Sequence, residues 1–255
     1  MNIVIPTYGR VNKQTTYDNL PAHWRERVKL VVRADEEPHH PIDRELIVLP
    51  TNVRDIGDVR HWLIHTCEEL EHDKLVMLDD DMVFAARRTD EPNKFRNMTN
   101  QDFDDMFADL EHQLGEFAHA GISHREGANR NTDPYVECTR QMRVLGYQKN
   151  ILRALNITGR TPVMEDFDVT LQLLRKGLPN RLCNNWVHNQ GGSQVTGGCS
   201  EMRTPELQAE AAHMLHELHP RFVKVVEKET KTSWGGGTRT DVTVYWKKAY
   251  NNGIK

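Results

Sequence analysis

The stretch Lys74–Leu75–Val76–Met77–Leu78–Asp79–Asp80–Asp81 decides how this chain is interpreted. A short apolar run of this kind predicts a buried strand, and here it ends in three consecutive carboxylates. Like charges at the end of a buried strand repel one another and resist desolvation, so a divalent cation would relieve them. Because carboxylate oxygens suit Mg²⁺ or Mn²⁺, Asp79 and Asp81 are candidate ligands of such an ion. A solvated acidic turn is the alternative interpretation.

Strands and helices alternate along the first part of the chain. Apolar runs at 2–5, 28–33 and 46–49 predict three strands, and residues 55–70 carry apolar side chains at helical spacing. This alternation predicts an α/β fold in which helices cover both faces of a central, mostly parallel sheet. Ligands of such sheets sit at the carboxyl ends of strands, which is where Thr7–Arg10, Asp35 and Asp79–Asp81 fall.

The rest of the chain gives further elements but no linker. We expect helices over 102–119, 148–155, 164–176 and 206–218, and strands over 135–147, 181–188 and 222–226. The polar segment 85–100 predicts an exposed loop, and the glycine-rich segment 191–198 a flexible loop that could close over a diphosphate. We therefore expect one domain over residues 1–227, followed by a basic, aromatic tail over 228–255.

Composition limits the class of protein. The chain has 255 residues, of which 38% are hydrophobic, so it can bury the core of a large α/β domain. A mean hydropathy of −0.68 and the absence of a long apolar run argue against a membrane span. The first residues lack a signal peptide and the four cysteines show no CxxC spacing, so we expect a cytoplasmic protein with reduced thiols. With a net charge of −4, a polyanion would have to meet a local basic patch.

The opening Ile3–Val4–Ile5–Pro6–Thr7–Tyr8–Gly9–Arg10 resembles that of glycosyltransferases with the GT-A fold, and Asp79–Asp80–Asp81 falls where their DxD motif is expected. The resemblance implies a single Rossmann-like domain that binds a nucleotide-sugar together with Mn²⁺ or Mg²⁺, which would neutralise the departing diphosphate. The residues implied to contact the donor are Pro6, Thr7, Tyr8, Arg10, Asp35, Gly57, Arg60, Asp79 and Asp80. Asp35 could instead be an ordinary acid at the end of a strand. Arg60 could instead be a solvated residue on a helix.

The motif Met164–Glu165–Asp166–Phe167–Asp168 begins a predicted helix and resembles the Glu–Asp pair of inverting enzymes in this family. The resemblance implies that Asp166, with Glu165 as the second candidate, deprotonates the acceptor hydroxyl. Acids in a first helical turn are also ordinary capping residues, which is the alternative. His188 follows a later strand, where the resemblance implies a further metal ligand; a surface or hydrogen-bonded histidine is the alternative.

Together the motifs are most similar to those of compact phage glycosyltransferases that act on hydroxymethylated pyrimidines in DNA. This resemblance implies a UDP-sugar donor, a 5-hydroxymethylpyrimidine acceptor and inversion of configuration, with a retaining course left open. A phage-encoded enzyme would work in the cytoplasm of its host cell. The chain lacks the Gln-x-x-Arg-Trp motif of processive polysaccharide synthases and is expected to have no membrane partner.

A DNA acceptor requires cations for its phosphates. The tail mixes lysines and arginines with Trp234, Tyr245 and Trp246, and a second basic cluster spans Arg87–Arg96. For both patches a solvated surface is the alternative. Three other functions stay open: transfer to a carbohydrate, a phosphoryl hydrolase or nuclease in which the acids hold two cations, and a non-catalytic module that binds nucleic acid.

Overall fold

A computed structural model describes residues 1–190, 204–229 and 237–253 of the chain, and its centre is a ten-stranded sheet. The strands of this sheet are β1 (Asn2–Pro6), β2 (Val28–Arg33), β3 (Leu46–Leu49), β4 (Lys74–Leu78), β5 (Met82–Arg87), β6 (Phe95–Asn97), β7 (His119–His124), β8 (Tyr135–Glu137), β9 (Val144–Gln148) and β10 (Asn180–Gln190). The helices between them are α1 (Thr15–Asn19), α2 (Ala22–Arg25), η1 (Glu37–His39), α3 (Ile56–His65), α4 (Asn100–Glu116), α5 (Arg125–Ala128), α6 (Lys149–Ala154) and α7 (Glu165–Arg175).

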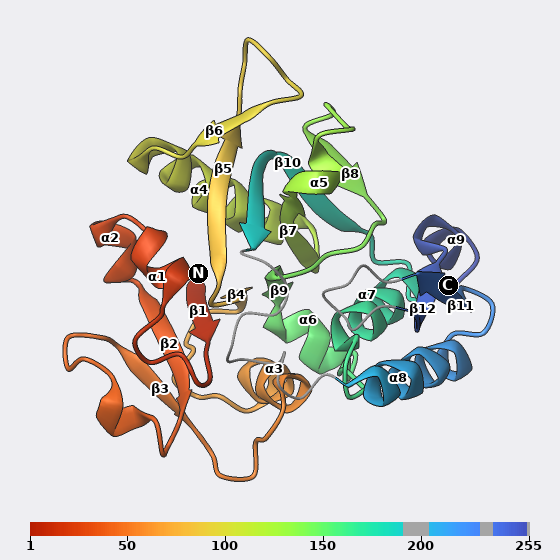
Figure 1. Cartoon of the computed structure of the whole chain (residues 1–255), viewed down its shortest axis with the longest axis horizontal. Coiled ribbons are helices and arrows are strands. Elements are labelled where there is room, and N and C mark those ends of the chain that lie inside the picture. Colours follow the sequence, from red (N-terminus) through yellow and green to blue (C-terminus); the bar gives the residue numbers. More distant parts are fainter. Residues whose placement is uncertain (191–203, 230–236, 254–255) are drawn as a thin grey trace.

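The sheet has the order β3-β2-β1-β4-β9-β7-β10-β5-β6, with β8 paired to β10 (Figure 1). Strands β1 to β4, β7 and β10 run in one direction, whereas β9, β5 and β8 are antiparallel to their neighbours. The predicted α/β fold with helices around a central sheet is therefore confirmed. Because β1, β2 and β4 are parallel neighbours, the loops that follow them meet at one edge of the sheet.

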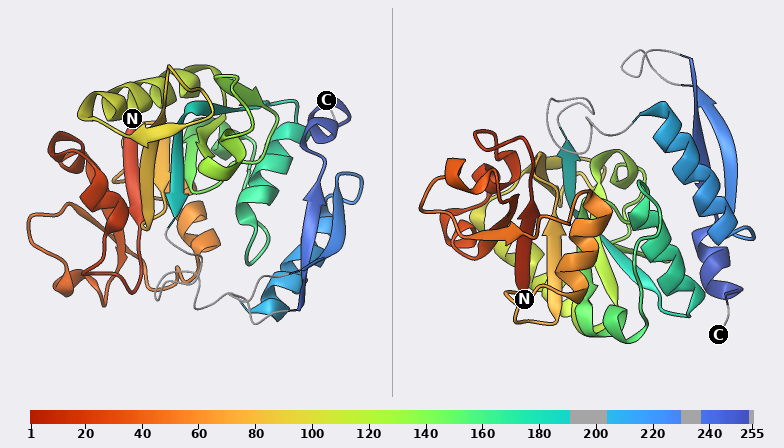
Figure 2. Two further views of the ribbon diagram at one scale, coloured as in Figure 1. Left: turned by 45° about the horizontal axis from the view of Figure 1, so that its top comes forward. Right: turned by 90° about the horizontal axis from the view of Figure 1, so that it is seen from below.

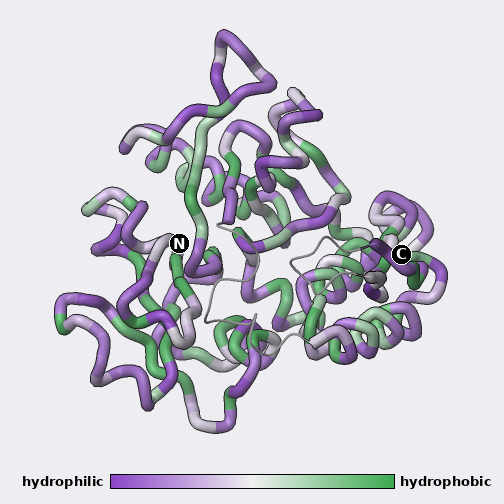
Figure 3. Tube along the Cα trace, viewed as in Figure 1, coloured by the Kyte–Doolittle hydropathy of each residue, from purple (hydrophilic) through white to green (hydrophobic). Residues whose placement is uncertain are grey.

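Apolar side chains cover both faces of the sheet, and the hydrophobic segments of Figure 3 follow its strands. On one face α4 contributes Phe103, Met106 and Leu110, and the side chain of Thr99 caps this helix in a capping box with Asp102. On the other face α3, α6 and α7 pack over the strands (Figure 2). Among the described helices, none is both long and apolar enough to cross a bilayer.

The segment expected to be an exposed loop, 85–100, contains structure that the sequence pattern missed. Strand β5 begins at Met82, directly after the acidic triplet Asp79–Asp81, and Ala85 and Ala86 are buried within it. It pairs with β10 on one side and with β6 on the other. This pairing brings the end of β10 next to Asp81.

The C-terminal part folds back onto α7 as a compact unit formed by α8 (Pro205–Leu218), β11 (Val223–Glu229), β12 (Thr238–Val244) and α9 (Trp246–Asn251) (Figures 1 and 2). We call these elements the C-terminal module. Strands β11 and β12 form an antiparallel hairpin, so the boundary expected at 227/228 lies inside β11. An apolar cluster that includes Leu171, Leu215 and Val242 joins the module to α7. The predicted flexible loop 191–198, Lys231, Trp234 and Lys255 lie outside the described residues.

Candidate functional site

A cavity of about 480 Å³ lies at the carboxyl ends of β1, β2 and β4. Its wall combines the loop after β1, the acidic triplet after β4, the first turn of α7 and part of the C-terminal module. The charged residues that line it are Arg10, Arg33, Arg54, Asp55, Arg60, Asp79, Asp80, Asp81, Arg140, Arg143, Glu165, Asp166, Arg239 and Asp241. A half-enclosed site with so many charges of both signs suits a ligand that is itself highly charged.

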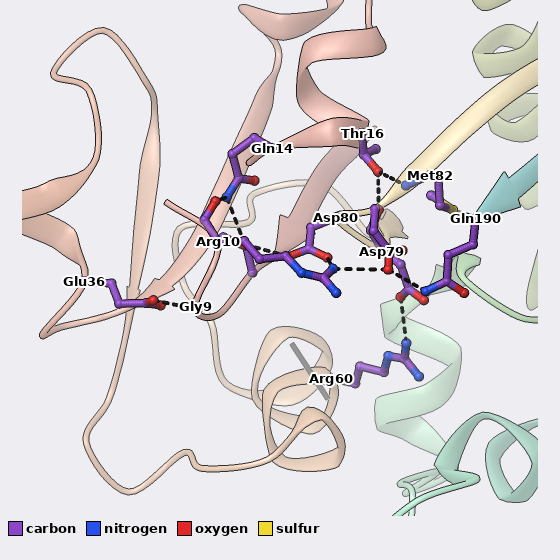
Figure 4. Close-up of polar contacts among 12 residues, drawn as sticks. Gly9, Arg10, Gln14, Thr16, Glu36, Arg60, Asp79, Asp80, Met82 and Gln190 are labelled. Carbon is purple, nitrogen blue, oxygen red and sulfur yellow. Dashed lines mark hydrogen bonds and ion pairs between the residues drawn. The ribbon is translucent and has the colours of Figure 1, made fainter. Parts of the chain in front are cut away.

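Asp80, the middle acid of the triplet, is held in a buried network (Figure 4). Its carboxylate accepts a hydrogen bond from the Thr7 hydroxyl at 2.7 Å and forms an ion pair with Arg10. Gln14 donates to the Thr7 hydroxyl at 2.9 Å and to the Arg10 carbonyl at 2.8 Å, which fixes the loop after β1. Although Thr7 and Arg10 oppose it, burial raises the pKa of Asp80. The network ties the first strand's loop to the triplet.

Asp79 faces α3, where Arg60 bridges two carboxylates. The Arg60 guanidinium lies 3.2 Å from Oδ1 of Asp79 and also pairs with Glu165. Although burial acts against it, the charge of Glu165 and then that of Asp79 raise the pKa of Arg60. For Asp79 itself, burial and the neighbouring Asp81 outweigh the opposing charge of Arg60 and raise the pKa to about 6. This carboxylate therefore lies in surroundings that disfavour its negative charge.

Asp81 is reached from two sides. Arg10 lies 3.2 Å from its Oδ2 atom, and the side-chain amide of Gln190 donates a hydrogen bond to the same oxygen. Gln190 is the last residue of β10, so the antiparallel pair of β5 and β10 brings together two segments separated by 109 positions in the sequence.

The Glu–Asp pair opens α7 at the opposite wall of the cavity. Met164 takes the left-handed conformation (φ 64°) at the N-cap, and both acids lie in the first helical turn, where the helix dipole favours negative charge. Glu165 is buried and paired with Arg60, whereas Asp166 is half-buried. In the described residues, the hydrogen bonds and ion pairs at this turn use Glu165 and Asp168, and Asp166 is the acid whose oxygens are available to a ligand.

The family model of the TET-associated glycosyltransferases matches residues 1–197. The chain belongs to this family. No curated protein matches the sequence. The fold is similar to that of TarS residues 1–349 from S. aureus, with 12% identity, a TM-score of 0.50, and coverage of 86% of this chain and 65% of that one. It is also similar to the mannosyltransferase PcManGT from Pyrobaculum calidifontis, solved with GDP-Man and Mn²⁺, with 13% identity, a TM-score of 0.52 and coverage of 85% and 64%.

The chain thus spans just under two thirds of both solved chains, and at such identities the likeness concerns the fold. The predictions of a GT-A-type fold and of a glycosyltransferase are confirmed. In this TET-associated glycosyltransferase, the cavity brings together most of the residues singled out in the sequence. Those that line it are Pro6, Thr7, Tyr8, Arg10, Arg60, Asp79, Asp80, Asp81, Glu165 and Asp166.

Three predicted site residues of the TET-associated glycosyltransferase lie elsewhere. Gly57 lines a small void behind Arg60, where a Cβ would come within 3.2 Å of Oδ1 of Asp55. Asp35 is exposed and is not among the described residues that line the cavity, because β2 ends at Arg33 and the chain turns away.

His188 is fully buried in β10, packs beside His124 with ring centroids 5.4 Å apart, and does not line the cavity. Burial lowers the pKa of His188 well below its usual range. Since His188 is not among the described residues that line the cavity, its predicted metal-binding role stays a prediction. Within residues 1–190, 204–229 and 237–253, no three His, Cys, Asp or Glu side chains are grouped closely enough to hold a metal ion by themselves.

Several cavity residues of the TET-associated glycosyltransferase escaped the sequence analysis. Arg33 and Gln190 end strands, so the rule that selected Asp35 and Asp79–Asp81 could have found them. Arg140 and Arg143 lie within a segment predicted to be one continuous strand, and Arg239 and Asp241 come from the tail, outside the expected domain.

The two predicted basic patches differ in how their charges are used. In the cluster Arg87–Arg96, Arg88 and Lys94 pair with Glu91, while Arg96 pairs with Asp102 at 2.6 Å. Arg87 itself donates to backbone carbonyls. This cluster therefore offers little unbalanced charge to a polyanion. In the tail, Lys247 and Lys248 are carried by α9.

Proposed function

We propose that this chain is a metal-dependent glycosyltransferase that moves a sugar from a UDP-sugar to a hydroxyl group, and that the acceptor is a 5-hydroxymethylpyrimidine in DNA. The observation that carries the proposal is one cavity that joins the loop after β1, the acidic triplet and the Glu–Asp turn of α7. A donor lying from the β1 loop to the triplet would have its anomeric carbon between the triplet and Asp166, where an acceptor could reach it.

The residues present fit a divalent cation. Asp79 and Asp81 supply the hard oxygen ligands that Mg²⁺ and Mn²⁺ prefer, and burial, together with the neighbouring Asp81, raises the pKa of Asp79, so a cation would stabilise its charged form. Such ions commonly take one or two carboxylates and complete their shell with phosphate oxygens and water. The bound ion would neutralise the diphosphate as it leaves. PcManGT, which was solved with GDP-Man and Mn²⁺, supports the proposal.

The proposed reaction is a direct displacement. Asp166 accepts the proton of the acceptor hydroxyl, the acceptor oxygen bonds to the anomeric carbon, and the bond from that carbon to the diphosphate breaks. Glu165 holds Arg60 beside Asp79 rather than acting as the base, since its carboxylate is already paired. A single displacement of this kind inverts configuration at the anomeric carbon.

The acceptor is the least constrained part of the proposal. The resemblance to phage enzymes supports a base in DNA, and Arg140 on the cavity wall is a cation that could meet a nearby phosphate, whereas Arg239 pairs with Asp241 at 3.0 Å. A pyrimidine in duplex DNA would have to leave the base stack to reach a cavity of this depth. A carbohydrate would present the same hydroxyl chemistry and is the alternative that the experiment must separate.

The test is a turnover assay with Mn²⁺, a panel of nucleotide-sugars, and DNA with or without 5-hydroxymethylated bases. We expect release of nucleoside diphosphate and a mass gain of one sugar on the modified DNA. Asp166→Asn should lower kcat about 10²- to 10⁴-fold, the usual effect of losing a general base, and Asp81→Ala should abolish turnover. Asp105→Asn, on an exposed position of α4, is the matched control and should match the wild type.

Three results would contradict the proposal. Transfer to oligosaccharides, with none to modified DNA, would show that the acceptor is a carbohydrate and not DNA. Turnover that persists in EDTA would show that the reaction does not need a metal ion. Cleavage of DNA without any donor would indicate the phosphoryl hydrolase class instead, which would require acids grouped around two cations.

A further inference from the structure

Arg143 lies in the cavity wall directly beside the acidic triplet, in a strained backbone conformation. Its φ of 63° is in the left-handed region, which residues other than glycine, asparagine and aspartate rarely adopt. The N–H of Val144 donates to the Met142 carbonyl at 2.7 Å, which closes a three-residue turn around Arg143. Turns of this kind with positive φ are rare and strained, and such strain is found mostly at functional sites.

The surroundings hold the turn in place. The N–H of Asp79 donates to the Arg143 carbonyl at 3.0 Å, so Arg143 continues the pairing of β9 with β4. Two residues earlier, Gln141 is buried and donates to the Arg181 carbonyl at 2.9 Å. Gly121 makes room for Gln141, because a Cβ there would collide with its side chain and with the Val144 carbonyl. The strained conformation of Arg143 is thus imposed by contacts on both sides of it.

The Arg143 guanidinium differs from the other two that lie beside the triplet. Arg10 is paired with Asp80 and Asp81, and Arg60 with Asp79 and Glu165. Among the described residues no carboxylate forms an ion pair with Arg143, and its Nη1 atom is buried without a hydrogen-bond partner. A buried donor without a partner is costly, and an anionic oxygen is the partner that suits a guanidinium best.

We propose that Arg143 is a further catalytic residue that binds the departing phosphate of the donor diphosphate. This rests on the proposed function. As the acceptor oxygen bonds to the anomeric carbon, the bond between that carbon and the phosphate oxygen breaks, and its electron pair stays on the phosphate. The acceptor proton passes to Asp166, and Arg143 takes no part in the proton transfer. Its hydrogen bonds strengthen as negative charge grows on the phosphate oxygens, which lowers the barrier.

The first test compares the binding of UDP and UMP by calorimetry in the presence of Mn²⁺, with GDP and GMP in their place if a guanosine donor is turned over. Only the diphosphate carries the phosphate that would contact Arg143. We expect Arg143→Ala to weaken UDP binding at least tenfold and to leave UMP binding unchanged. Arg130→Ala, at an exposed position outside the cavity, is the control and should change neither. An unchanged ratio of the two affinities would overturn the inference.

The second test uses Arg143→Gly, since glycine accepts the left-handed conformation without strain. We expect kcat to fall about 10²- to 10³-fold, as when one donor to a developing oxyanion is removed, while the thermal unfolding midpoint does not fall. Arg143→Lys should recover part of kcat. A purely structural role would instead lower the midpoint and leave the turnover of the folded fraction unchanged.

The two tests separate this inference from the proposed function. If the wild type turns over no nucleotide-sugar, the proposed function fails. If the wild type is active and Arg143→Gly matches it, only the inference fails. A rise in KM for the DNA acceptor, with the UDP to UMP affinity ratio unchanged, would show that Arg143 binds an acceptor phosphate and would overturn the assignment to the donor.

Discussion

Each of the three aspartates after β4 lies beside a guanidinium that another part of the chain supplies. Arg10 comes from the loop after β1 and Arg60 from α3. A buried strand can end in three acids because these cations offset charges that would otherwise resist burial. The offset is incomplete at Asp79, whose pKa remains raised to about 6 by burial.

That raised pKa predicts how the stability depends on pH. The folded chain holds the Asp79 proton more tightly than the unfolded chain, whose pKa is near 3.8, so ionisation of Asp79 lowers the stability between about pH 4 and pH 6. Asp79→Asn should therefore be more stable than the wild type at pH 7 and equal to it at pH 4. Urea unfolding across this range checks it, with Asp105→Asn as the control; a less stable Asp79→Asn at pH 7 would contradict it.

At the residue scale, the sequence predicted the position of the acidic residues better than that of the side chains around them. Asp79 and Asp81 follow an apolar run directly, so their place at a strand end could be predicted from the neighbouring residues alone. His188 also follows a predicted strand, but the side to which a strand residue points depends on register, and here the ring is buried away from the cavity. Arg143 could not be predicted, because no residue type near it signals a left-handed turn.

The elements were predicted best where one strong pattern decided them. Strand β4 has the expected bounds, 74–78, and α8 begins within one residue of its expected start. Strand β5 was missed because its alanines and arginine carry little intrinsic preference for strands, and its burial comes from pairing with β10 and β6. The predicted strand 135–147 is divided into β8 and β9 by the turn that carries Arg143.

Helix α7 carries the Glu–Asp pair, and a buried polar contact fixes its position. Asp168 is fully buried and accepts hydrogen bonds from Arg160 and from His219 at 2.7 Å. Arg175 donates to the other ring nitrogen of His219 at 2.9 Å, so His219 is neutral and donates to Asp168. Although burial acts against it, these donors lower the pKa of Asp168.

We predict that His219→Ala lowers the free energy of unfolding by about 3 kcal/mol, because it removes a buried ring and two hydrogen bonds to charged groups. His213→Ala, at an exposed position of α8, the helix whose C-cap is His219, should have almost no effect. Denaturant unfolding followed by circular dichroism measures both. Equal stability of the two variants would show that this contact does not anchor α7.

At the scale of the whole molecule, the folded structure continues beyond the residues that match the family. The match stops at residue 197, yet Leu215, Phe222 and Val242 of the C-terminal module complete the apolar cluster around Leu171 and Leu174 of α7. The module also supplies Gln208, Arg239 and Asp241 to the cavity wall. It is therefore part of the core and of the site.

A chain that stops after residue 203 should be insoluble or should lose cooperative unfolding, because the apolar side of α7 would be left in water. Removal of residues 254–255 alone is the control and should leave both properties unchanged. Solubility on expression and thermal melting test the prediction. A soluble shortened chain with a sharp melting transition would mean that the module is an independent appendage.

The hold of Arg10 and Gln190 on Asp81 has a consequence for the order in which ligands arrive. A divalent ion that enters alone has to compete with both side chains for the same carboxylate and would leave Arg10 with one counter-charge fewer. A diphosphate that enters with the ion brings its own negative oxygens, which can take over that guanidinium. Under the proposed function, the ion and the nucleotide would therefore bind cooperatively, because each would raise the affinity of the protein for the other.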